Sequence, residues 1–274
     1  MAYIKNPVEM MKAIGDVGRK KGELSVFQLL LRGFMGGMFI AVGGALATVA
    51  STGISSVGLK KFMLGAVFPV GLIAIVLTGM ELFTGDVMCV PVAVFQKKTT
   101  WGKVWKVWLW VLIGNFFGSI FWAYLMSVGP FVSLSASGAT PNVFGQTAIK
   151  IAEAKVLTYQ SAGAFGLWSV FMKAVGCNML VNLAILLAFV AEDAVGKMLG
   201  IWFPIMAFVT TGFEHSIANM YFVPVGMMLG ANVSWGQFLY WNLIPVILGN
   251  IVGGLLLIGV VYHLAHGREA VETN

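Results

Sequence analysis

Six stretches of mainly apolar residues, each long enough to cross a lipid bilayer as a helix, dominate this sequence. A membrane-spanning helix needs roughly 20 such residues, about twice the length of a strand in a transmembrane barrel. Hydrophobic residues make up 59% of the chain and charged residues 10%, so we predict an all-α integral membrane protein. The stretches cover residues 28–49, 62–95, 107–127, 166–190, 199–228 and 238–262, and polar residues interrupt the second and the fifth.

The two interrupted stretches contain the same short element. Residues 78–81 read Thr-Gly-Met-Glu and residues 211–214 read Thr-Gly-Phe-Glu, and in each copy Val-Pro-Val begins nine residues after the glutamate. Asn115 and Asn250 lie in a second matching pair, Gly-Asn-x-x-Gly, in the third and sixth stretches. Polar inserts at corresponding places in two halves of a membrane chain point to a transport site.

The order of these marks indicates an inverted duplication. A third, weaker match places a basic residue, Arg32 or Lys173, in the first span of each half. Because each half holds three spans, the second half must start from the opposite side of the bilayer. We therefore predict two inverted three-helix repeats, residues 28–127 and 166–262, with the second and fifth helices broken.

The segments outside the repeats are short. Residues 1–27 should form an amphipathic helix, because Asn-Pro-Val-Glu at residues 6–9 is typical of an N-cap with a capping box. Basic residues gather in that segment and in the loop after the second stretch, which predicts cytoplasmic termini. That loop holds Lys97, Lys98, Lys103 and Lys106. The other segments are an extracytoplasmic loop at 128–165, helical over 143–159, and a cytoplasmic tail at 263–274.

Five ionisable residues lie at membrane depth, where a charge is costly to bury and a functional role is the default interpretation. They are Glu81, Asp86, Lys173, Glu214 and His215. A broken helix directs the free N–H groups and partial positive charge of a half-helix toward the bilayer centre. Together with Lys173 and a protonatable His215, these half-helices are expected to attract an anion.

The two glutamates oppose anion binding unless they face away from the centre. We therefore expect Glu81 and Glu214 to have a structural role, capping the broken backbone or contacting a neighbouring subunit. His215 could be a hydrogen-bonded packing residue, but its position in the break and its titration near neutral pH favour a functional role. Asn115 and Asn250 could line the pore or bond between helices, and the sequence leaves both open.

The sequence predicts no cofactor, no metal site and no enzymatic activity. Cys89 and Cys177 lack CxxC spacing and are expected to be buried free thiols. The sixteen methionines show no clustering typical of a copper site, so core packing is their expected role. No HExxH or aspartate-rich motif is present, and the basic excess is a topology signal that gives no support to nucleic-acid binding.

Two segments carry a resemblance to a known family. Residues 81–85, Glu-Leu-Phe-Thr-Gly, and residues 212–220, Gly-Phe-Glu-His-Ser-Ile-Ala-Asn-Met, resemble the two signatures of the formate/nitrite transporter family. The likeness extends from the N-terminal segment through the sixth span. It implies an aquaporin-like fold in the cell (inner) membrane and a homopentamer with one pore per subunit. The N-terminal helix resembles a family segment that can alter pore opening with pH.

The resemblance also implies roles along the substrate pore. A loop of Leu82, Phe83 and Thr84 would interrupt the second helix, with His215 at the pore centre. Lys173 would draw anions toward the vestibule. The outer hydrophobic constriction would consist of Phe68 and Phe208 and the inner one of Leu72 and Leu82, and the second signature adds Asn219 to the pore.

These features predict transport of a small monovalent anion, with formate first and nitrite or hydrosulfide next. A weak-acid anion drawn to Lys173 would become more basic as it loses water, and would take a proton by way of His215 or its water network to cross as the neutral acid. The alternative is an aquaporin-like channel for small neutral solutes, which the fold resemblance alone permits, although the breaks lack Asn-Pro-Ala motifs. Whether Asp86 discourages anions or anchors the loop is left open.

Overall fold

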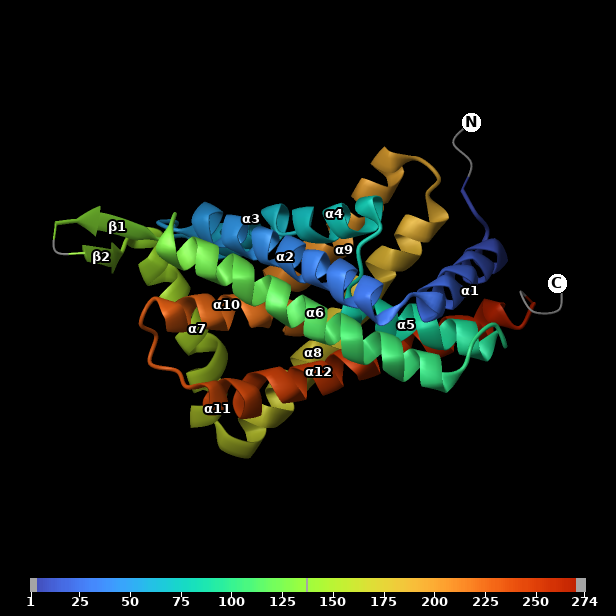
Figure 1. The fold of residues 1–274 in the computed structure, drawn as a ribbon. Helices are drawn as coiled ribbons and strands as arrows, with labels where there is room; N and C mark the ends of the chain where they lie inside the picture. The colour runs from blue at the N-terminus through green and yellow to red at the C-terminus, as the bar shows by residue number, and fades with distance from the viewer. Residues whose placement is uncertain (1–3, 137, 270–274) are drawn as a thin grey trace.

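The computed structural model describes residues 4–136 and 138–269, and most of its helices run along one long axis (Figure 1). The first and the last described residues lie at one end of this bundle, the terminal end, and a two-stranded hairpin lies at the other, the hairpin end. In chain order the elements are α1 (Pro7–Glu23), α2 (Val26–Ser51), α3 (Val57–Val67), α4 (Val70–Thr78), α5 (Phe83–Phe95), α6 (Trp101–Val128), β1 (Val132–Ser135), β2 (Gly138–Pro141), α7 (Val143–Ser161), α8 (Gly163–Val190), α9 (Ala194–Thr211), α10 (Ser216–Met228), α11 (Trp235–Phe238) and α12 (Ile244–Ile251).

The predicted fold class is confirmed. Within the described residues, six helical stretches are long and apolar enough to cross a membrane, judged by length and composition. The last of them runs from α11 through α12 with π-helical turns at Leu239–Leu243, Val252–Val260 and His263–Gly267. The second and fifth helices are broken, into α3–α4 with α5 and into α9 with α10.

Each break begins at a glycine with left-handed backbone. Gly79 has a φ of 71° and Gly212 a φ of 83°, a conformation that glycine adopts freely and that ends an α-helix. The non-helical residues are therefore 79–82 and 212–215. The loop expected at Leu82, Phe83 and Thr84 is therefore shifted, because Phe83 and Thr84 lie in the first turn of α5.

The helices outside the spans form largely as the sequence predicts. The side chain of Asn6 caps α1 and the side chain of Glu9 completes the capping box. α7 starts where the helical part of the long loop was predicted to start and ends two residues later than predicted. The antiparallel hairpin of β1 and β2 was not predicted, because its strands have four residues each and carry little periodic signal.

α6 begins at Trp101 rather than at residue 107 as predicted. Lys103 and Lys106 therefore lie on the helix and not in the preceding loop. The Lys106 ammonium donates to the carbonyls of Gly22 at 3.0 Å and Leu24 at 2.7 Å. A lysine can occupy this turn because its apolar stem follows the helix while its ammonium binds the free carbonyls at the end of α1. The contact ties α1 to the bundle.

Glycines bring the helices into close contact. A Cβ atom on Gly36 of α2 would lie 2.0 Å from the carbonyl oxygen of Glu81, in the first break. A Cβ atom on Gly253 would lie 2.2 Å from the carbonyl oxygen of Val175 in α8. Small residues allow such approach in lipid, where no hydrophobic effect drives helices together. The broken segments are thus held directly against neighbouring backbone.

Candidate functional site

The two breaks meet in the interior of the bundle. Thr84, from the first half of the chain, places its Oγ1 atom 2.9 Å from the Nε2 atom of His215, from the second half. Thr84 is fully buried and His215 is 3% exposed. One hydrogen bond between side chains therefore joins the two halves at the point where both helices are interrupted.

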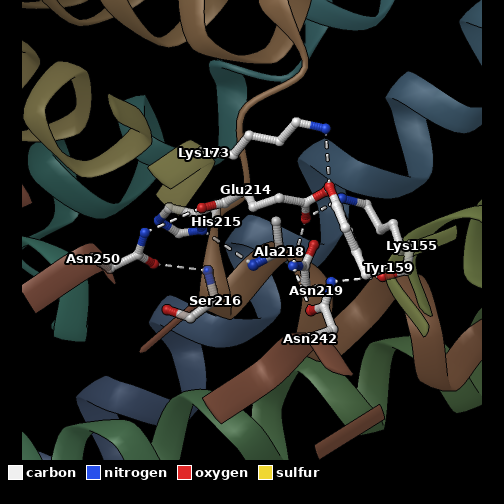
Figure 2. A network of polar contacts seen from close by, with 10 residues as sticks. All are labelled: Lys155, Tyr159, Lys173, Glu214, His215, Ser216, Ala218, Asn219, Asn242 and Asn250. Carbon is white, nitrogen blue, oxygen red and sulfur yellow. Dashed lines mark hydrogen bonds and ion pairs between the residues drawn. The ribbon is translucent and has the colours of Figure 1, made fainter. Parts of the chain in front are cut away.

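The second ring nitrogen of His215 fixes the tautomer. The backbone N–H of Ala218 donates to Nδ1 at 3.1 Å, which caps α10 (Figure 2). Because Nδ1 accepts this bond, the hydrogen of the neutral imidazole is on Nε2. Nε2–H then donates to the Thr84 oxygen, and the hydroxyl hydrogen of Thr84 is left free to donate to a third group.

Asparagines satisfy the backbone groups exposed at both breaks. Asn250 accepts from the Ser216 N–H at 2.9 Å and donates to the Glu214 carbonyl at 3.1 Å (Figure 2). It also donates to the Ala174 carbonyl at 2.8 Å. At the first break Asn115 makes the equivalent bonds with Phe83 at 2.9 Å, Gly33 at 2.7 Å and Glu81 at 3.0 Å.

These bonds answer what Asn115 and Asn250 do, which the sequence leaves open, and they correct the capping role expected of Glu81 and Glu214. Asn115 and Asn250 bond between helices. They also cap the broken backbone, a task expected of the Glu81 and Glu214 side chains. The physical reason is that the breaks expose donors and acceptors together, and an amide supplies both whereas a carboxylate only accepts.

Glu214 is at the centre of a buried polar cluster. Its carboxylate accepts from the Lys155 ammonium at 2.8 Å, the Tyr159 hydroxyl at 2.9 Å and the Asn219 amide at 2.7 Å, as Figure 2 shows. Asn219 also donates to Asn242 at 2.7 Å. Lys155 and Tyr159 belong to α7, so this helix neutralises and holds the glutamate of the second break.

Lys173 extends the cluster toward the hairpin end. Its ammonium donates to the Tyr159 hydroxyl oxygen at 3.2 Å (Figure 2), while the same hydroxyl donates to Glu214. Burial, the charge of Glu214 and that hydrogen bond all raise the pKa of Tyr159 well above its ordinary value. The phenol therefore stays neutral, and in the described part of the chain Lys173 forms no ion pair with a carboxylate.

The first break has an equivalent cluster at the terminal end. The Lys21 ammonium of α1 contacts Glu81 and also donates to Asp86 at 2.6 Å, and Arg32 lies 3.8 Å from Glu81. Burial lowers the pKa of Lys21, but Asp86 and Glu81 outweigh it and raise that pKa well above its ordinary value. Of the two roles left open for Asp86, the structure supports an anchor, which holds α1 against the break.

Comparison of the two clusters shows that α1 and α7 are equivalent elements of the inverted repeat. Lys21 pairs with a glutamate 60 residues away and Lys155 with one 59 residues away. Sequence reasoning missed both lysines as partners and treated their helices as additions outside the repeats. Their nearly constant sequence separation from Glu81 and Glu214 is the signal that could have identified them.

A cavity flanks the central pair on each side. One, of about 340 Å³, opens at the hairpin end and is lined by Phe68, Phe208, Lys173, His215 and Asn219 among others. The Phe68 and Phe208 rings lie 5.9 Å apart between centroids, and the His215 ring stacks on Phe208 at 5.8 Å. The cavity therefore reaches the histidine past an aromatic pair.

The other cavity, of about 390 Å³, lies at the terminal end. Leu72 and Leu82 line it, together with Lys21 and Glu81. Phe83 lines neither cavity, because its ring packs against Trp108 of α6 at 6.2 Å between centroids. Of the residues expected along the pore, Phe83 and Thr84 line neither cavity: Phe83 packs on Trp108, and Thr84 is fully buried against His215. No group of three or more potential metal-binding side chains occurs among the described residues.

The sequence matches a known family over nearly its whole length. The formate/nitrite transporter family model matches residues 8–264. The chain belongs to the formate/nitrite transporter family. It is 40% identical to a probable formate transporter of Methanothermobacter thermautotrophicus, over 97% of this chain and 98% of that one.

Two solved structures are similar to this formate/nitrite transporter family member. One, an FNT family ion channel, has a TM-score of 0.79 and 25% identity and covers 93% of this chain and 98% of its own. The other, a pentameric formate channel with formate bound, has a TM-score of 0.72 and 30% identity and covers 88% and 97%. The protein is thus a multi-pass membrane transporter and not an enzyme.

Proposed function

We propose that this chain carries a small monovalent anion, formate first and nitrite or hydrosulfide next, through a pore in each subunit, with proton linkage at the central Thr84–His215 pair. The observation that carries the proposal is the buried Thr84–His215 bond, with one cavity lined by His215 and another by Leu82 and Gly85, the neighbours of Thr84. Lysine side chains line both cavities. The name of the structural relative that binds formate supports the choice of substrate.

The geometry suggests how the barrier is crossed. An anion attracted to Lys173 loses water as it approaches the aromatic pair, and the low dielectric favours its protonated form. The Thr84 hydroxyl, held by His215 Nε2–H, donates its free hydrogen to a substrate oxygen. Because the Ala218 N–H occupies Nδ1, protonating the histidine would cost the cap of α10. We therefore assign the substrate proton to cavity water rather than to the imidazole itself.

We further propose a homopentamer in the cell membrane with both termini in the cytoplasm. The pentameric structural relative supports the assembly, and the basic residues of the N-terminal segment support the orientation. In this orientation the terminal end faces the cytoplasm and the hairpin end the outside. Residues 1–27 and 263–274 are then cytoplasmic, and residues 128–165 lie outside. Light scattering of the purified protein coupled to size exclusion measures the assembly, and a monomer or dimer would contradict it.

Transport into proteoliposomes tests the substrate and the proton linkage together. Formate, nitrite, hydrosulfide and acetate are compared at one acidic and one neutral external pH, with empty vesicles and glycerol swelling as controls. We expect saturable formate flux that rises in acid. Absence of flux above empty vesicles for every anion would refute the proposal, and glycerol permeation alone would favour the neutral-solute channel.

His215→Asn and His215→Phe separate the two sources of the proton. Asparagine can still donate to Thr84, whereas phenylalanine cannot. If water supplies the proton, we expect His215→Asn to keep the acid stimulation of flux and His215→Phe to lose most flux. Loss of acid stimulation in His215→Asn at retained flux would instead place the proton on the histidine.

A further inference from the structure

An exposed lysine lies beside the hairpin-end cavity. Lys61, near the start of α3, lines this cavity together with Lys155, Lys173 and Glu214. A Cβ atom on Gly212 would lie 3.1 Å from the Lys61 ammonium, so the missing side chain of this glycine leaves room for the charge. The ammonium is thereby placed next to the second break.

The charges of the cavity do not cancel. Glu214 is its one carboxylate, and Lys155 already pairs with it at 2.8 Å. Lys173 bonds to the neutral Tyr159 hydroxyl. In the described part of the chain Lys61 takes part in no ion pair. Two of the three lysine charges are therefore left to attract an anion, and Lys61 carries the one that is exposed to solvent.

The inverted repeat places a similar lysine at the opposite cavity. α9 occupies in the second half the place of α3 in the first, and Lys197 in its first turn lines the terminal-end cavity. Lys197 is also absent from the ion pairs of the described residues. Each broken helix thus carries, within its first five residues, a lysine that lines a cavity and forms no ion pair with any described residue.

We propose that Lys61 and Lys197 are the first anion-capture residues of the two cavities, which take small monovalent carboxylates or anions of similar size from solution. The inference rests on the proposed transport function and adds a step to it. An anion first meets the exposed ammonium of Lys61, moves to the half-buried ammonium of Lys173, and then reaches the aromatic pair. Unpaired charges at the mouth of a low-dielectric cleft raise the local concentration of the oppositely charged substrate.

Lys61→Gln tests the assignment, with Lys60→Gln as a matched control. Lys60 is the preceding residue and is also exposed, but it lines a separate groove with Lys150. We expect Lys61→Gln to raise the half-saturating formate concentration about threefold to tenfold, with saturating flux unchanged and with the difference shrinking at high salt. Lys61→Arg should restore the wild-type value, and Lys60→Gln should match the wild type.

Sidedness gives a sharper form of the test. In vesicles that hold the protein in one orientation, Lys61→Gln should raise the half-saturating formate concentration for influx from the hairpin side. Lys197→Gln should raise it for influx from the terminal side. Equal effects of Lys60→Gln and Lys61→Gln, or no side preference for either cavity lysine, would overturn the inference while the wild-type flux still supports the proposed function.

A second measurement does not depend on transport. The wild-type protein is treated with an amine-acetylating reagent with and without formate, and acetylation of each lysine is quantified by mass spectrometry. We expect formate to protect Lys61 more than Lys60. Protection of Lys61 in a protein without formate flux would support the capture site and count against the transport function. Equal protection of the two lysines would refute the capture site.

Discussion

Replacement of Thr84 by valine is the most direct test of the central pair. Valine has nearly the shape of threonine but puts a methyl group where the hydroxyl was. Thr84 is fully buried, and its only described side-chain bond is the one to His215 at 2.9 Å. The change therefore removes one acceptor for Nε2–H and one donor for the substrate, and leaves the surrounding packing nearly intact.

The size of the effect follows from these two lost bonds. An unpaired Nε2–H in a buried site costs about 1–3 kcal/mol, which should lower the stability of the folded protein by that amount. A lost hydrogen bond to the substrate at the barrier also costs about 1–3 kcal/mol, which corresponds to a reduction in flux of about 5- to 150-fold. Thr84→Ser keeps the hydroxyl and should stay close to the wild type in both respects.

Stopped-flow uptake of formate into proteoliposomes, normalised to reconstituted protein, measures the flux. Thermal unfolding in detergent measures stability on the same samples. If Thr84→Val and Thr84→Ser carry formate equally fast while both remain folded, the hydroxyl does not contact the substrate at the barrier and the proposed role of the pair is wrong. A slow Thr84→Ser variant would also contradict the reasoning, because it retains the donor.

Three further predictions concern the framework. Lys155→Met should destabilise the protein by about 3 kcal/mol. This is the lower end of the range for a broken buried ion pair, because Tyr159 and Asn219 still bind Glu214. Thermal unfolding should show that adding Glu214→Gln restores part of the lost stability, and no restoration would exclude the unpaired charge as the cause. Gly36→Ala should cost about 1–3 kcal/mol because its Cβ would clash with the Glu81 carbonyl, whereas Gly58→Ala, with nothing within 4 Å of its Cβ, should have no such cost in the same unfolding assay. Because the pKa of Lys21 is raised, its ion pairing stabilises the docked α1 fully at any pH below the ordinary lysine pKa of 10.5, and this stabilisation is lost only as the pH rises through the higher folded pKa. Limited proteolysis should therefore find α1 equally protected at neutral and mildly alkaline pH, but released in Lys21→Met. Release of wild-type α1 between these two pH values would contradict the assignment.

The sequence was sufficient for the membrane helices and for the inverted duplication. Apolar length and composition act locally, so each span can be predicted without knowledge of its neighbours. The glycines, glutamates and prolines of the two breaks recur in register, so the halves and their interruptions follow from comparing the chain with itself. The start of α6 was missed because Lys103 and Lys106 reduce the local hydropathy, and only their contacts show why a helix tolerates them.

Only the tertiary structure decided which groups compensate the buried charges. Glu81 and Glu214 pair with lysines about 60 residues away, on helices that no hydropathy pattern connects to the spans. The partner of His215 Nε2 is likewise distant, because Thr84 lies 131 residues away. Ion pairs and hydrogen bonds between distant segments form only when packing brings them together, so the local sequence predicts that the charges need partners but does not identify them.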